Sequence, residues 1–228
     1  MKFKCFVVII CSIDLIYSLG LKVIDSSPTY DISKLKLSNK TDQIMIVVPD
    51  SYESYSAKFY YYLKNESNWI EYINVDAHIG KNGLGKERQG DYKTPVGAYN
   101  FTKYFGVADN PGTSLPYIKL NEYHYWDGDS YSTMYNRFVD FRYYSDFDTS
   151  VSEHLIDEQI AYKYAMNINY NEKGIPYKGA GIFLHCYTKN PYTAGCVAIP
   201  ENDMLEVMKT VNENCIIIID LDENIYNY

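Results

Sequence analysis

The chain has 228 residues, of which 46% are apolar, 22% are charged and 26 are tyrosine. This composition supports a packed core and excludes a collagen, a coiled coil and a multi-span membrane protein. The formal net charge is −8, and no run of Lys or Arg interrupts the acidic surplus. Because no basic footprint for phosphates exists, we expect neither a nucleic-acid partner nor binding to an anionic membrane surface.

The first twenty residues have the pattern of an export signal. Lys2 and Lys4 precede an apolar run over residues 6–19, which Asp14 interrupts. A basic start followed by a short apolar stretch is typical of a secretory signal peptide. We therefore expect residues 1–20 to be a signal peptide and the protein to be secreted or held at the cell surface. An uncleaved anchor is the alternative.

The rest of the chain divides into a short leader and one domain. Residues 21–41 are rich in Ser, Lys and Asp and have little periodicity, so they are predicted to be an extended leader. Residues 42–228 contain no internal repeat and no clear linker, and are predicted to fold as a single domain.

Short β-branched and aromatic runs predict about seven strands and two helices. The strand candidates are residues 44–48, 69–75, 98–104, 117–125, 162–170, 181–185, 196–199 and 215–219. Residues 153–160 and 202–211 are the helix candidates, the second with Met204, Met208 and Val211 at helical spacing. Five glycines and one proline between His78 and Gly97 predict a loop with demanding backbone angles. The fold is thus predicted to be mainly β.

A cysteine and a histidine stand where two predicted strands meet. His185 ends one apolar strand, and Cys196 opens the next strand directly after Gly195. A Cys–His pair can form a nucleophile, because a thiolate forms readily beside an imidazolium. Gly195 permits a tight turn, and its amide and that of Cys196 could form an oxyanion hole. On this spacing alone, a buried cysteine and a structural histidine are the alternative.

The segments around these residues resemble a known family. Residues 179–185 and 191–200, which contain Thr-Ala-Gly-Cys, resemble the active-site strand pair of the L,D-transpeptidase (YkuD-like) catalytic domain family. Residues 90–97 are similar to the Gly-Asp-x-x-Thr-Pro-x-Gly signature of the family. A third set is similar to one branch of it: Trp126, Asp129, Tyr135-Asn136-Arg137 and Tyr170-Asn171. The resemblance covers about residues 42–221.

This resemblance implies a β-sandwich with one or two short helices, and an enzyme acting on peptidoglycan stem peptides. Cys196 would attack the carbonyl that precedes D-Ala, His185 would be the general base, and the amides of Gly195 and Cys196 would hold the oxyanion. An amine on a second stem would accept the acyl group. The resemblance implies no cofactor and no metal, and His78, His124 and His154 have no metal-ligand spacing. We expect a monomer.

Four further residues are predicted to contact substrate: Thr193, Trp126, Tyr135 and Asn136. Packing is the alternative role for each of them. The sequence departs from better-known members at Ala194, where they have a second His, and at residues 197–198, where they have a polar pair.

Four alternatives concern the reaction and the thiols. Water could replace the amine, which would make the protein an L,D-carboxypeptidase, or the domain could bind cell wall without catalysis. A papain-like protease is disfavoured because its cysteine precedes its histidine in the chain. An odd number of cysteines after residue 20 suggests one free thiol, and a Cys186–Cys215 bridge would leave Cys196 free.

Overall fold

The computed structural model describes residues 28–228. The predicted signal peptide and the first residues of the predicted leader lie outside the described residues. No helix in the described part of the chain is both long and apolar enough to cross a membrane.

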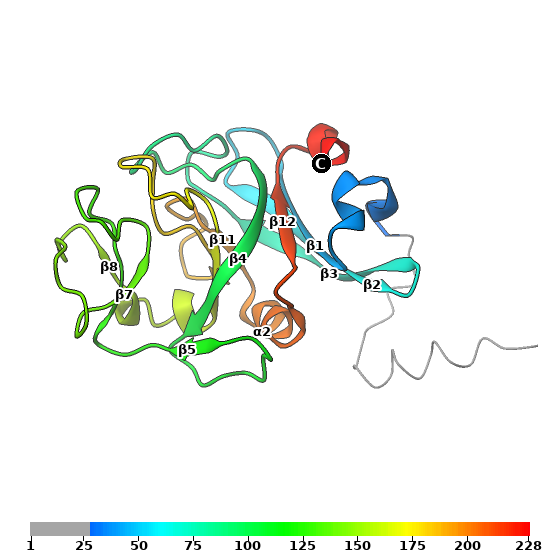
Figure 1. Ribbon diagram of the computed structural model, residues 1–228. Helices are drawn as coiled ribbons and strands as arrows, with labels where there is room; N and C mark the ends of the chain where they lie inside the picture. The colour runs from blue at the N-terminus through cyan, green and yellow to red at the C-terminus, as the bar shows by residue number, and fades with distance from the viewer. Residues whose placement is uncertain (1–27) are drawn as a thin grey trace, which may run out of the picture.

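One large sheet closes on itself to form a barrel. Its strands follow the order β12-β1-β2-β3-β11-β10-β9-β4-β5, and β12 also pairs with β4, which closes the ring (Figure 1). The strands are β1 (Gln43–Pro49), β2 (Ser56–Asn65), β3 (Asn68–His78), β4 (Gly97–Gly106), β5 (Tyr117–Lys119), β9 (Ala165–Ile168), β10 (Phe183–Cys186), β11 (Val197–Ile199) and β12 (Ile216–Ile219). The mainly-β prediction is confirmed. The predicted sandwich is replaced by a barrel, because the β4–β12 ladder joins the two ends of one continuous sheet.

Two apolar layers explain why the central strands have no polar face. Met45 and Val47 of β1 point into the barrel core, whereas Ile44 and Ile46 point to an outer core. The same alternation continues in the parallel partner β12, where Ile218 faces the outer core. Because successive side chains of a strand point to opposite faces, burial on both faces requires a continuous apolar run.

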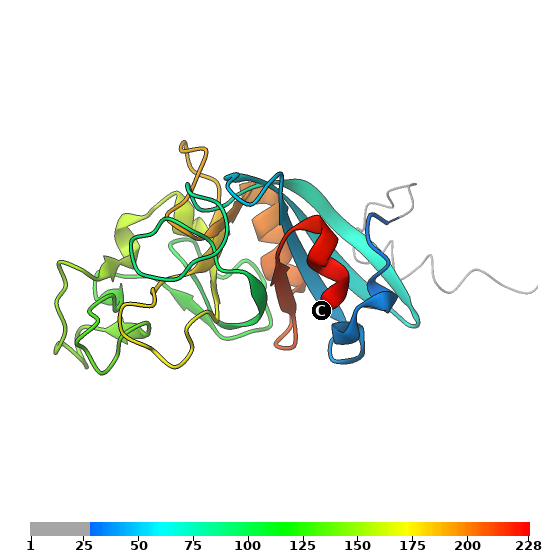
Figure 2. The same ribbon diagram turned by 90° about the horizontal axis from the view of Figure 1, so that it is seen from above.

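The outer core includes part of the predicted leader. The 3-10 turns η1 (Ile32–Lys34) and η2 (Lys36–Asn39) pack beside the C-terminal turn η5 (Asp222–Asn227), as the blue and red ribbons in Figure 2 show. The amide of Lys36 donates to the carbonyl of Tyr228 over 2.6 Å. Residues 28–41 are therefore packed onto the barrel, and the prediction of an extended leader is wrong for them.

One α-helix, α2 (Glu201–Thr210), covers an end of the barrel interior. Met204, Met208 and Val211 are buried in the barrel core, as their helical spacing predicted, and Val207 is buried with them. The acidic residues Glu201 and Asp203 stand in its first turn, where a negative charge stabilises the helix dipole.

A second, small sheet forms the lobe seen at the left of Figure 1. Its strands are β7 (Phe138–Asp140), β6 (His124–Trp126) and β8 (Glu153–His154), in that order. The predicted strand 117–125 is therefore divided between the two sheets. The predicted helix 153–160 is wrong, since β8 and a three-residue 3-10 turn, η3 (Leu155–Asp157), replace it. The predicted strand 162–170 is shorter, because η4 (Ala161–Lys163) occupies its start.

Candidate active site

The fold brings Cys196 and His185 to one cavity. Strands β10 and β11 are parallel neighbours, with Leu184 opposite Val197 and His185 opposite Ala198. This register places Cys196 level with Phe183, on the same face of the sheet as His185. Both residues line a cavity of about 480 Å³. The sequence-based expectation that the two side chains meet at the end of adjacent strands is thus consistent with the geometry.

Two backbone groups bond the thiol of Cys196. Its Sγ donates to the carbonyl of Gly181 over 3.4 Å and accepts from the amide of Phe183 over 3.3 Å. Burial raises the pKa of the Cys196 thiol to about 12, and the nearby carboxyl of Glu153 contributes to this rise. The sequence led us to expect a thiolate beside an imidazolium. Burial instead favours the neutral forms of both side chains, and a neutral thiol has to lose its proton during the attack.

A backbone hydrogen bond fixes the tautomer of His185. Its Nδ1 lies 2.8 Å from the carbonyl oxygen of Cys186. A carbonyl only accepts, so Nδ1 carries the hydrogen and Nε2 carries the free lone pair. Burial lowers the pKa of His185 to about 4, which keeps the imidazole neutral. The ring also packs edge-on against Tyr162, with 5.6 Å between the centroids.

The turn before Cys196 is held by Thr193. The hydroxyl of Thr193 accepts from the amide of Gly195 over 3.0 Å and donates to the carbonyl of Cys196 over 2.7 Å. Gly195 has a φ of +144°, and a Cβ there would lie 2.7 Å from the carbonyl oxygen of Lys93. Only glycine fits this close approach without displacing the loop. Thr193 lines the cavity, as predicted for a substrate contact.

Trp126, Tyr135 and Asn136 are buried and do not belong to the cavity lining. The indole of Trp126 donates to Oδ1 of Asn136 over 2.9 Å, and the amide of Gly181 donates to the same atom over 3.0 Å. The hydroxyl of Tyr135 accepts from the amide of Gly179 over 3.1 Å. These side chains hold the segment whose carbonyl binds the thiol, so the geometry favours a supporting role over direct contact with substrate.

Glu153 is a cavity residue that sequence reasoning missed. It lies in the two-residue strand β8, lines the cavity with Cys196, and accepts a hydrogen bond from the hydroxyl of Tyr162. Burial raises the pKa of the Glu153 carboxyl to about 7, with a smaller contribution from Glu158. No periodicity marks so short a strand. A carboxyl with a strongly raised pKa inside a cavity is typical of a functional site.

We expect Glu153→Gln to stabilise the fold at alkaline pH. The folded-state pKa of about 7 lies above the ordinary value of 4.5, so folding loses stability as pH rises between these values. A pKa difference of one between the folded and unfolded states corresponds to about 1.4 kcal/mol, so the gain should be near zero at about pH 4.5 and up to roughly 3 kcal/mol at about pH 8. Urea unfolding at both pH values measures this, with the exposed Glu87→Gln as control. An equal gain at both pH values would contradict the account.

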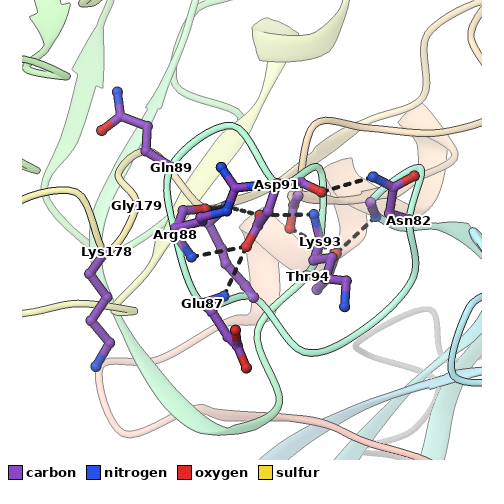
Figure 3. A network of polar contacts seen from close by, with 12 residues as sticks. Asn82, Glu87, Arg88, Gln89, Asp91, Lys93, Thr94, Lys178 and Gly179 are labelled. Carbon is purple, nitrogen blue, oxygen red and sulfur yellow. Dashed lines mark hydrogen bonds and ion pairs between the residues drawn. The ribbon is translucent and has the colours of Figure 1, made fainter.

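Asp91 organises the glycine-rich loop beside the cavity. Its carboxylate accepts from Nζ of Lys86 over 2.8 Å and from the amides of Glu87, Arg88 and Lys93 over 2.8, 3.0 and 3.1 Å (Figure 3). Burial opposes the charge, but these donors outweigh it and lower the pKa of Asp91 to about 2. The side chains of Lys86 and Asp91 are only 3% and 9% exposed, so the ion pair is buried.

Replacing Asp91 with Asn should strongly destabilise the fold. The change leaves the buried ammonium of Lys86 without its counter-charge, which typically costs about 3–5 kcal/mol. The matched control is Asp76→Asn, which removes the exposed ion pair with Lys58. Surface pairs contribute little, so the control should unfold close to the wild type. Similar urea midpoints for Asp91→Asn and the wild type would show that the loop does not depend on this pair.

The structure also shows the state of the cysteines and of the groups that could bind a metal. Cys186, Cys196 and Cys215 are all free and buried, so no Cys186–Cys215 bridge is present. Within residues 28–228, no three His, Cys, Asp or Glu side chains gather into a group that could hold a metal ion.

The chain was compared with known proteins. The family model described as L,D-transpeptidase catalytic domain (YkuD) matches residues 44–219. No curated protein matches the chain.

Three solved structures illustrate the structural likeness. Bd1075 of Bdellovibrio bacteriovorus is 15% identical with a TM-score of 0.42, over 82% of this chain and 50% of that one. The helical cell shape determining protein Pgp2 of Campylobacter jejuni is 19% identical with a TM-score of 0.43, over 81% and 50%. The L,D-transpeptidase of Mycobacterium smegmatis is 12% identical with a TM-score of 0.36, over 78% and 58%. The chain spans about half the length of the first two structures.

Proposed function

The chain belongs to the L,D-transpeptidase catalytic-domain family, and we propose that it is a cysteine-dependent acyl transferase acting on peptidoglycan stem peptides. The observation that carries this proposal is that Cys196 and His185 line one cavity from the same face of two adjacent strands. The Thr-Ala-Gly-Cys turn next to them supports it, because the hydroxyl of Thr193 bonds the amide of Gly195 and the carbonyl of Cys196 and so fixes the backbone that carries the nucleophile.

The first half-reaction forms a thioester. Sγ of Cys196 attacks the carbonyl carbon of the third stem residue, which is bonded to the nitrogen of D-Ala. At the same time Nε2 of His185 takes the thiol proton. The negative oxygen of the tetrahedral intermediate is held by the amide of Cys196. The amide of Gly195, which the sequence also suggested for this role, instead donates to the hydroxyl of Thr193. The intermediate then collapses, the carbon–nitrogen bond breaks, and His185 returns the proton to the leaving D-Ala.

The second half-reaction releases the acyl group. An amine of a second stem attacks the thioester carbonyl, His185 accepts a proton from that amine, and the proton returns to the Cys196 thiolate. If water attacks instead, the same residues give an L,D-carboxypeptidase. The two activities share the nucleophile and differ in which acceptor reaches the thioester. The proposed substrate lies outside the cytoplasm, in agreement with the proposed signal peptide and secretion.

Mass spectrometry of the products tests the proposal. The purified protein is incubated with a disaccharide-tetrapeptide, and we expect either loss of D-Ala or a cross-linked dimer with concomitant release of D-Ala. The dimer indicates transfer, and the shortened monomer indicates hydrolysis. Unchanged substrate in the presence of a titratable Cys196 thiol would favour the alternative of a non-catalytic cell-wall binding protein.

A further inference from the structure

One hydroxyl connects the glycine-rich loop to the turn that carries the nucleophile. Thr94 has no exposed surface and belongs to the Thr-Pro-x-Gly segment of that loop. Its Oγ1 accepts from the amide of Gly80 over 2.8 Å and donates to the carbonyl of Gly195 over 2.8 Å. No other side-chain hydrogen bond in residues 28–228 ends on the Gly195 carbonyl.

The direction of this chain of hydrogen bonds follows from the groups themselves. An amide N–H can only donate, and a carbonyl oxygen can only accept. The single hydroxyl hydrogen of Thr94 must therefore point at Gly195, while a lone pair receives the hydrogen of Gly80. Removal of the hydroxyl would leave one buried donor and one buried acceptor unpaired.

The bond to Gly195 also orients the amide of Cys196. The carbonyl of Gly195 and the N–H of Cys196 belong to one planar trans peptide unit, in which they point in opposite directions. The carbonyl points toward Thr94, which is buried and does not line the cavity. The N–H therefore points away from Thr94. The residues on either side of Gly195, Ala194 and Cys196, both line the cavity.

Two glycines make this bridge possible. A Cβ at Gly80 would lie 2.5 Å from the carbonyl oxygen of Tyr92, and a Cβ at Gly195 would lie 2.7 Å from that of Lys93. At Gly80 and at Gly195 the backbone thus lies so close to the glycine-rich loop that any side chain would collide with it. Pro95, directly after Thr94, restricts the backbone of the bridging residue as well.

We propose that Thr94 is a positioning residue whose hydroxyl aims the Cys196 amide at the oxyanion formed during acyl transfer. The proposal rests on the proposed function, because it concerns the same nucleophile. It assigns a chemical task to the threonine of the glycine-rich loop, more than 100 residues before Cys196 in the chain.

Two matched pairs of variants test it. Thr94→Val keeps the shape of wild-type Thr94 and lacks the hydroxyl, while Thr94→Ala and Thr94→Ser share the loss of the methyl group and differ only in the hydroxyl. Each variant is reacted with p-nitrophenyl acetate. In this reaction Sγ of Cys196 attacks the ester carbonyl, an oxyanion forms, p-nitrophenolate leaves and the acetyl group stays on the sulfur. Each is also reacted with iodoacetamide, in which Sγ displaces iodide at a saturated carbon and no oxyanion forms.

We expect p-nitrophenyl acetate to acylate Cys196 about 10- to 100-fold more slowly in Thr94→Val than in the wild type. The same difference is expected between Thr94→Ala and Thr94→Ser. Their alkylation by iodoacetamide should stay within about twofold, because the thiol and His185 are unchanged. The KM for the disaccharide-tetrapeptide should change less than kcat, since the amide acts on the transition state. Thermal unfolding identifies any variant that does not fold. If Thr94→Val is one, the Ala–Ser pair decides.

Two results would overturn the proposal. Equal acylation by Thr94→Ala and Thr94→Ser would show that the hydroxyl has no effect. A parallel fall of acylation and alkylation would show that Thr94 only supports the fold. A third result would overturn the proposed function alone. In that case the wild type leaves the disaccharide-tetrapeptide intact, but p-nitrophenyl acetate still acylates Cys196 at a rate that depends on the hydroxyl of Thr94. If neither p-nitrophenyl acetate nor the disaccharide-tetrapeptide acylates the wild type, both proposals are overturned.

Discussion

Replacing Cys196 with Ala should reduce the release of D-Ala from a disaccharide-tetrapeptide by on the order of 10³-fold or more, since no thioester can form. The side chain contributes two weak sulfur hydrogen bonds, to Gly181 and from Phe183, so its loss should leave the barrel folded. The release of D-Ala is followed by mass spectrometry at equal enzyme concentration.

Cys186→Ala is the matched control for this variant. Cys186 is the next residue after His185 and is also buried, but it is not part of the cavity lining and bonds the carbonyl of Tyr164. We expect the control to keep its activity. Loss of activity in Cys186→Ala with retention in Cys196→Ala would contradict the assignment of Cys196 as the nucleophile.

The second large effect is expected for His185→Asn. The amide nitrogen of Asn can replace Nδ1 as donor to the carbonyl of Cys186, while the base at Nε2 is lost. Loss of a general base typically reduces the rate by about 10²–10⁴-fold. Single-turnover release of D-Ala and thermal unfolding are measured together. A well-folded His185→Asn with activity within about fivefold of wild type would contradict the role of His185.

The pH profile of the wild type gives a second test of the same residue. The pKa of His185 is lowered to about 4 by burial, so the imidazole stays neutral as pH falls until this value is approached. The acid limb of kcat/KM should therefore lie below about pH 5, rather than near the ordinary histidine value of about 6.5. An acid limb centred near the ordinary value would mean that His185 is solvated in the active protein.

The parts of the fold that the sequence predicted are those with an uninterrupted local pattern. A few neighbouring residues are enough to predict burial in β1 and β12, because each is an apolar run. The spacing of Met204 and Met208 does the same for α2. Strand β2 was missed because three consecutive tyrosines and a register shift between Tyr61 and Tyr62 break its alternation. Barrel closure depends on the β4–β12 ladder, which joins segments more than 100 residues apart and leaves no local signal.

The candidate site divides in the same way. The common cavity of Cys196 and His185 was predictable, because ten residues separate them and they stand at the ends of two adjacent strands. The supporting roles of Trp126 and Asn136 were not predictable from the sequence. Only the fold shows that Asn136 accepts from both Trp126 and the amide of Gly181, outside the cavity. Glu153 comes to the cavity from the small sheet, where a two-residue strand carries no periodicity.

The most direct test of the account is the mass of the protein during turnover. Wild-type protein is mixed with a disaccharide-tetrapeptide, quenched in acid and analysed intact and after proteolysis. The account predicts an adduct equal to the mass of the substrate minus that of D-Ala, on the peptide that contains Cys196. Release of D-Ala with no adduct in rapidly quenched samples, or an adduct carried by Cys186 or Cys215, would contradict it.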